Sequence, residues 1–156
     1  MKFDWKKLLL CLAIPLGVGG LSALVSGGMD SFEVLRKPPL SPPGWLFPVV
    51  WTVLYLLMGY ASYRILKSGA EQEKVNKALT LYGIQLALNF LWSPVFFGFE
   101  WYLAAFLILV AMWVFIYLTI KSFSEIDKTA GDLLLPYLLW VTFAGYLNLG
   151  VYILNR

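Results

Sequence analysis

The sequence contains no histidine and a single cysteine, and only 13% of its 156 residues are charged. Without histidine the chain lacks the commonest haem and zinc ligand and the usual proton shuttle near neutral pH. Cys11 alone can form neither an intramolecular disulfide nor a thiolate metal site. We therefore expect no metal centre and no required cofactor.

What the chain has in excess is apolar and aromatic side chains, at 60% and 17% of its residues. Charged residues make up about a quarter of a soluble domain, so this composition indicates an integral membrane protein. The length predicts a single domain, residues 1–156. The net charge of +3 comes from lysines scattered over loops, which indicates membrane topology and argues against nucleic-acid binding.

Five apolar runs predict five transmembrane helices and hence an all-α bundle. The first run is longer than the 7–15-residue core of a signal peptide, and no clear cleavage site follows it, so we expect a retained helix. Almost nothing connects the third and fourth runs, which must be antiparallel neighbours. The predicted spans are residues 8–26, 45–66, 78–98, 101–120 and 133–154.

The loop between the first two spans is rich in proline, with four prolines in residues 38–43. Proline fixes φ, removes backbone donors and disfavours helix in the residue before it, so the loop must be extended and rigid. Directly after Gly44 the sequence becomes aromatic and aliphatic, and Pro48 is tolerated in the first helical turn. A stiff loop thus leads into a membrane helix that carries Trp51 one turn inside.

Lysine and arginine are distributed unequally between the two sides of the predicted bundle. Nine lie on the side of the N-terminus and three, Arg36, Lys37 and Arg156, on the other. The positive-inside rule then places the N-terminus in the cytoplasm and the C-terminus outside, in what we expect to be a bacterial cell membrane. Acidic residues fall only in loops or at span ends, which argues against an ion-coupled pump.

Three amides lie within the predicted spans, and two interpretations are open for them. Gln85 and Asn89 share a helix face, with Asn89 roughly 16 Å from the cytoplasmic end, and Asn148 lies at about the depth of Trp51. Such amides often join membrane helices by mutual hydrogen bonds without any ligand. Pro94 favours the alternative of a cavity, because it frees the carbonyl of Phe90 beside Asn89.

Two further patterns each have a structural and a functional interpretation. Gly83 and Ala87, four residues apart, indicate either close packing inside the bundle or the seam of a homodimer. Leu149, Tyr152 and Arg156 fit a loose pattern for contact with a sterol-like lipid, which arises often at aromatic helix ends.

Three blocks in order over the five spans resemble the translocator protein family, also known as the tryptophan-rich sensory proteins or peripheral-type benzodiazepine receptors. The first is the proline-rich loop leading into Trp51-Thr-Val-Leu-Tyr-Leu-Leu-Met-Gly59. The second runs from Gln85 to Gly98, and the third from Pro136 to Asn148. The resemblance implies a five-helix bundle, often dimeric, whose first loop acts as a lid over a pocket for porphyrins and related hydrophobic molecules, and in some members cholesterol.

Carried over by position, the resemblance implies seven ligand-binding residues. Trp51 and Trp140 match tryptophans implicated in light-dependent porphyrin breakdown, and Phe32 stands at a first-loop position that is aromatic in relatives. The full set is Phe32, Trp51, Asn89, Phe90, Trp140, Ala144 and Asn148.

We therefore expect a membrane protein that binds protoporphyrin IX or a similar ligand to sense, sequester or transport it. A large flat π-system suits a cleft walled by aromatic side chains. The alternative is enzymatic: light- and oxygen-dependent porphyrin degradation in which Trp51 and Trp140 take part. A third possibility is a small scaffold or regulatory subunit, for which the charged loops would matter more than a cavity.

Overall fold

The computed structural model describes residues 3–27 and 30–156, and every regular element in these ranges is helical. Lys2, one of the lysines counted above, lies outside them. Five segments are long and apolar enough to cross a membrane, which confirms the predicted all-α bundle of five spans. The elements are α1 (Trp5–Ser26), α2 (Asp30–Glu33), α3 (Leu46–Leu66), α4 (Gln72–Ser93), the π-helix η1 (Pro94–Gly98), α5 (Tyr102–Ile126), α6 (Lys128–Leu133) and α7 (Leu135–Asn155).

Several helices extend beyond the apolar runs at the end of the bundle that holds the N-terminus. The third span begins at Gln72 and not at residue 78, and the fourth ends at Ile126 and not at residue 120. The fifth span is preceded by the short helix α6 in a region predicted to be a polar loop. Lysine, glutamate and glutamine are good helix formers, so the helix continues where the hydropathy falls.

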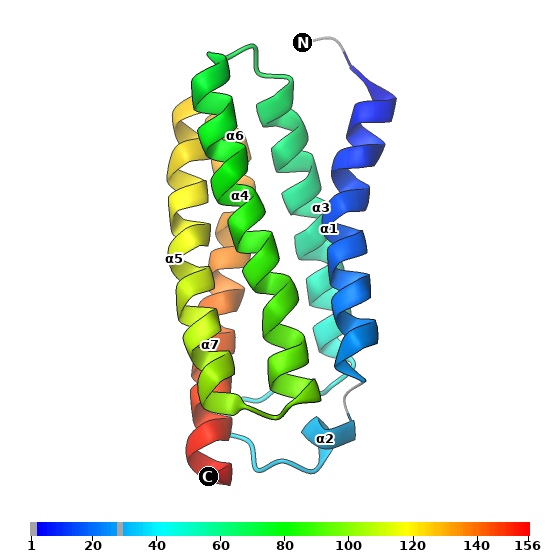
Figure 1. The fold of residues 1–156 in the computed structure, drawn as a ribbon, viewed down its shortest axis with the longest axis vertical. Coiled ribbons are helices and arrows are strands. Elements are labelled where there is room, and N and C mark those ends of the chain that lie inside the picture. Colours follow the sequence, from blue (N-terminus) through cyan, green and yellow to red (C-terminus); the bar gives the residue numbers. More distant parts are fainter. Residues whose placement is uncertain (1–2, 28–29) are drawn as a thin grey trace.

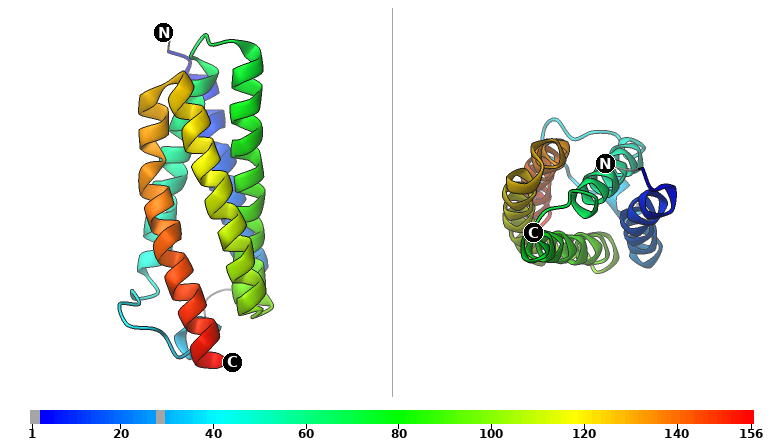
Figure 2. Two further views of the ribbon diagram at one scale, coloured as in Figure 1. Left: turned by 90° about the vertical axis from the view of Figure 1, so that its left-hand side faces the viewer. Right: turned by 90° about the horizontal axis from the view of Figure 1, so that it is seen from above.

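The five long helices form a closed ring. Packing neighbours follow the order α3, α1, α4, α5, α7, and α6 closes the ring against α3. Figure 2 shows this arrangement in the view from above. The two chain ends lie at opposite ends of the bundle, and α2 and the proline-rich loop (residues 34–45) lie with the C-terminus at what we call the loop end (Figure 1).

Helices α1 and α3 approach closely because glycine leaves room for a backbone. A Cβ added at Gly59 would lie 2.7 Å from the carbonyl oxygen of Cys11 and from Cα of Leu12. A Cβ at Gly19 would collide with the ring of Tyr55. The Gly59 contact brings α3 close to the first half of α1, and the Gly19 contact brings the second half of α1 close to the middle of α3.

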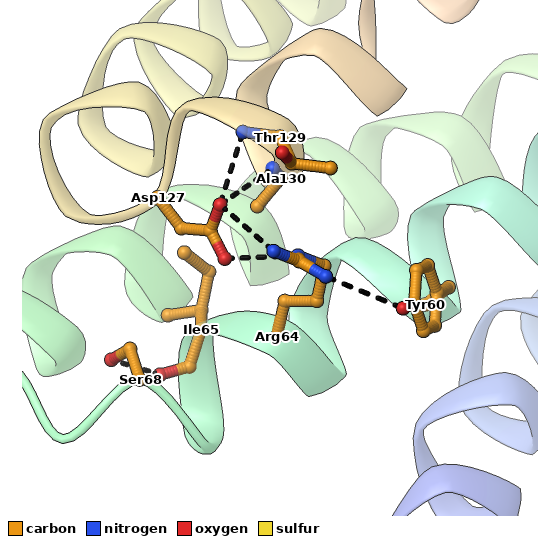
Figure 3. A network of polar contacts seen from close by, with 7 residues as sticks. All are labelled: Tyr60, Arg64, Ile65, Ser68, Asp127, Thr129 and Ala130. Carbon is orange, nitrogen blue, oxygen red and sulfur yellow. Dashed lines mark hydrogen bonds and ion pairs between the residues drawn. The ribbon is translucent and has the colours of Figure 1, made fainter. Parts of the chain in front are cut away.

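An ion pair joins α3 to the turn between α5 and α6 at the end opposite the loop end. Nε of Arg64 lies 2.9 Å from Oδ2 of Asp127, and Arg64 also donates a 3.4 Å hydrogen bond to the hydroxyl of Tyr60. Figure 3 shows that the same carboxylate caps α6, where Oδ1 accepts from the backbone N–H groups of Thr129 (3.0 Å) and Ala130 (3.4 Å). Asp127 thus both starts α6 and closes the ring of helices.

Candidate functional site

A pocket with a volume of about 350 Å³ lies between α1, α3 and the end of α4. Its walls are mainly aromatic on the α3 and α4 sides and small on the α1 side, where glycine, alanine and serine predominate. None of the described residues that line it is charged. They are Leu16, Gly19, Gly20, Ser22, Ala23, Ser26, Phe47, Pro48, Trp51, Thr52, Tyr55, Asn89, Trp92, Ser93 and Phe97.

Trp51 and Tyr55 form the α3 wall because residues four apart lie on one helix face. Their rings stack at 5.6 Å between centroids with an interplanar angle of 26°. Trp51 also meets Tyr137 of α7 edge to face at 6.1 Å. The predicted site residue Trp51 therefore borders the pocket, and its ring is held on two sides.

A buried chain of hydrogen bonds runs behind the pocket through Asn89. The Tyr55 hydroxyl donates to Oδ1 of Asn89 at 2.8 Å, and Nδ2 of Asn89 donates to the hydroxyl of Tyr137, also at 2.8 Å. Tyr137 in turn donates to Oε1 of Gln85. The amides thus join α4 to α3 and α7, as the ordinary interpretation has it, and Asn89 also lines the pocket. Sequence analysis missed the two tyrosines, although Tyr55 lies one turn from Trp51.

Asn148 is occupied by structural contacts and does not line the pocket. Its Oδ1 accepts a 2.9 Å hydrogen bond from the indole N–H of Trp92, and its Nδ2 donates to the carbonyl of Tyr102 at 2.8 Å. These bonds fasten α7 to α4 and α5. They also orient Trp92, which does line the pocket.

The carbonyl of Phe90, which Pro94 was expected to free, accepts a hydrogen bond from another helix. Oγ of Ser22 on α1 donates to it at 2.7 Å. One turn further on, Oγ of Ser26 lies 2.8 Å from Oγ of Ser93. The interruption of α4 is therefore used to bind α1, and the π-helix η1 continues the span beyond Pro94. Phe90 contributes its backbone carbonyl to this contact.

Phe47, which lines the pocket, belongs to an aromatic cluster that also includes Trp140 and Phe32. Phe47 packs edge to face on Trp140 at 5.8 Å and on Phe32 at 5.4 Å. Phe32 also packs against Phe97 at 6.1 Å and is only 4% exposed. Ala144 is buried, and the indole nitrogen of Trp140 is buried with no hydrogen-bond partner among the described residues.

The structure thus brings together only part of the predicted set. Trp51 and Asn89 line the pocket, and Phe32 packs on two residues that line it. The other four, Phe90, Trp140, Ala144 and Asn148, lie outside its lining, so their direct contact with a ligand stays a prediction. Sequence analysis gave no signal for the α1 wall, because its glycine, alanine and serine residues resemble ordinary packing residues of a membrane helix.

The proline-rich loop is fastened to α7. The side chain of Asn155 accepts from the backbone N–H of Arg36 at 3.1 Å and donates to its carbonyl at 2.8 Å. The Tyr146 hydroxyl donates to the carbonyl of Pro39 at 2.6 Å, and Pro38 packs so closely on Gly150 that an added Cβ would lie 2.5 Å from it. Three positions along one helix therefore hold this loop.

The chain is similar to known proteins over most of its length. The model of the TspO/MBR family matches residues 9–154. The tryptophan-rich protein TspO of Chlorobaculum tepidum is 42% identical over 150 residues, which cover 95% of each chain. The tryptophan-rich sensory protein of Cereibacter sphaeroides is 39% identical over 99% of this chain and 95% of its own. The human translocator protein is 38% identical over 88% of this chain and 82% of its own. The chain is therefore an integral membrane protein that belongs to the TspO/MBR family.

Proposed function

We propose that this protein binds porphyrins such as protoporphyrin IX in the pocket between α1, α3 and α4, and thereby senses, sequesters or transports tetrapyrroles. The observation that carries the proposal is the pocket wall: Phe47, Trp51, Tyr55, Trp92 and Phe97 surround a space without a charged lining residue. Aromatic faces attract a flat π-system, and an uncharged wall does not penalise its burial. The names of the bacterial relatives, tryptophan-rich and sensory, agree with this role.

The size of the pocket limits how a tetrapyrrole would bind. At about 350 Å³ it lies near the lower end of the 300–1,000 Å³ typical of small-molecule sites. A whole porphyrin would need more room than this, so the pocket would have to widen when such a ligand binds.

A titration of detergent-purified protein with protoporphyrin IX tests the proposal, followed by the Soret absorbance and by tryptophan fluorescence. We expect saturable quenching and a weaker affinity in Trp51→Phe. Trp101→Phe is the matched control, because Trp101 is 61% exposed at the start of α5 and does not line the pocket. Non-saturable quenching, or equal affinities in both variants, would contradict the proposal.

A second candidate function is light-dependent porphyrin degradation, favoured by the position of Trp51 at the pocket and its stack on Tyr55. Light and oxygen would supply the driving force, because the lining offers neither a carboxylate nor an imidazole for acid–base catalysis. We expect no degradation in the dark, and under illumination slower product formation in Trp51→Phe and Trp140→Phe at saturating porphyrin. Equal rates in wild type and the double variant at matched occupancy would remove this candidate.

The proposal also includes the location of the protein in the membrane and its partners. The protein would lie in a bacterial cell membrane with its N-terminus in the cytoplasm, as the lysine distribution indicates. Gly83 and Ala87 are both exposed on the outer face of α4, and nothing lies within 4 Å of a Cβ added at Gly83. They therefore do not serve packing inside this bundle, which favours the homodimer seam. Contact of a sterol-like lipid with Tyr152 and Arg156 stays a prediction.

A further inference from the structure

The pocket opens on the side of the bundle, between α1 and α3. Gly20 and Ala23 of α1 and Pro48 and Thr52 of α3 line the pocket and are exposed at the surface, whereas Asn89 at its back is buried. The first two side chains are small, and a Cβ added at Gly20 would meet nothing within 4 Å. We call these four residues the side opening.

The side opening lies at a level of the bundle where the neighbouring surface is apolar. Gly20 is six residues before the end of α1 at Ser26, and Thr52 is six residues after the start of α3 at Leu46, which places both about 9 Å inside the helix ends. On the same turns Leu21 and Leu24 of α1 are 58% and 79% exposed. Side chains of this kind on a membrane span contact lipid, so the side opening faces the hydrocarbon of the bilayer.

The route from the loop end is obstructed. Entry there would require removal of Phe32 from its buried position against Phe47 and Phe97. It would also disturb a loop that Asn155 holds at Arg36 through two hydrogen bonds. No comparable contact crosses the side opening among the hydrogen bonds of the described residues, since Thr52 bonds within its own helix, to the carbonyl of Pro48.

We propose that the ligand enters and leaves this pocket sideways, from the bilayer, through the side opening, while the proline-rich loop stays fastened to α7. The inference rests on the proposed function and adds to it the route that the ligand takes and the medium from which it comes. The ligand is a molecule dissolved in the membrane, whose uncharged aromatic face passes between Gly20 and Thr52, and whose charged groups stay near the membrane surface. The bilayer thus acts as the reservoir from which the pocket fills.

The test follows binding kinetics in phosphatidylcholine vesicles that contain the protein and protoporphyrin IX, with tryptophan quenching as the readout. Gly20→Leu narrows the side opening. Gly17→Leu is its matched control, because Gly17 is also an exposed α1 glycine with nothing within 4 Å of an added Cβ, and it does not line the pocket. Ala23→Leu, with Ala13→Leu at another exposed position of α1 as control, repeats the comparison with an exchange between two good helix formers. Asn155→Ala loosens the loop.

We expect Gly20→Leu and Ala23→Leu to slow association and dissociation together, each by about tenfold relative to their controls. A blocked route raises the barrier in both directions, whereas a lost contact raises only the dissociation rate. Asn155→Ala should leave the association rate unchanged.

Three results would overturn the side route while leaving the binding function intact: equal rates in the leucine variants and their controls, a change confined to dissociation, or faster association in Asn155→Ala. Absence of saturable binding in the wild-type protein would overturn the proposed function, and the route with it.

Discussion

Tyr137→Phe tests whether the buried hydrogen-bond chain holds the bundle together. The substitution keeps the ring but removes the hydroxyl that accepts from Asn89 and donates to Gln85. Gln85 is 1% exposed and Asn89 is 4% exposed, so the freed amide atoms cannot turn to water. A buried polar group left unpaired costs about 1–3 kcal/mol, whereas interhelical hydrogen bonds in membranes average about 0.6 kcal/mol. We therefore expect a loss of about 1–3 kcal/mol of unfolding free energy.

Denaturant unfolding in mixed micelles, followed by circular dichroism, measures this loss. Tyr152→Phe is the matched control, because Tyr152 lies on the same helix, is partly exposed and makes no side-chain hydrogen bond among the described residues. Adding Gln85→Leu to Tyr137→Phe should recover part of the loss, since it removes one of the two unpaired groups. A Tyr137→Phe protein as stable as Tyr152→Phe would show that the chain of hydrogen bonds contributes nothing to stability.

Three other predictions concern packing, the pocket and topology. Gly59→Ala should lower stability by about 1–3 kcal/mol, because the new Cβ would lie 2.7 Å from the α1 backbone. Gly83→Ala should not lower stability, because its Cβ would have no neighbour within 4 Å, and thermal unfolding measures the difference between the two variants. Ala144→Phe should weaken protoporphyrin IX affinity about tenfold and also lower stability by about 1–3 kcal/mol because Ala144 is buried, and unchanged affinity would place Ala144 outside the ligand-bound site. A reporter active only outside the cytoplasm should function when fused after Arg156 and fail within residues 69–74, and the reverse would contradict the lysine count.

The spans could be predicted because hydropathy alone defines them, but the helix ends could not. Residues 72–77 are polar and were expected to be loop, yet they form the first turns of α4. Hydropathy reports the medium around a segment and not its backbone conformation. The region around Asp127 was also expected to be loop, yet the Asp127 carboxylate caps the start of α6. Its ion-pair partner, Arg64, is 63 residues away in the sequence, so no local pattern could predict that contact.

The pocket could be predicted only in part, because apolar residues surround each helix on all sides. A soluble helix shows its buried face through its polar residues, but a membrane helix in contact with lipid does not. Polar residues at depth therefore carried the signal, and one of them, Asn89, lines the pocket. Asn148 gave the same signal and bonds Trp92 and Tyr102, because a buried amide can bind either a ligand or a neighbouring helix.

The most direct test of the proposed pocket locates the porphyrin among the seven tryptophans. Each indole N–H gives its own NMR signal, and a bound porphyrin shifts nearby signals strongly. We predict that protoporphyrin IX shifts the signals of Trp51 and Trp92, which line the pocket, and leaves those of Trp5 and Trp101, which are 69% and 61% exposed, unchanged. Shifts confined to Trp5 and Trp101 would show that the porphyrin lies on the outside of the bundle and would contradict the proposed site.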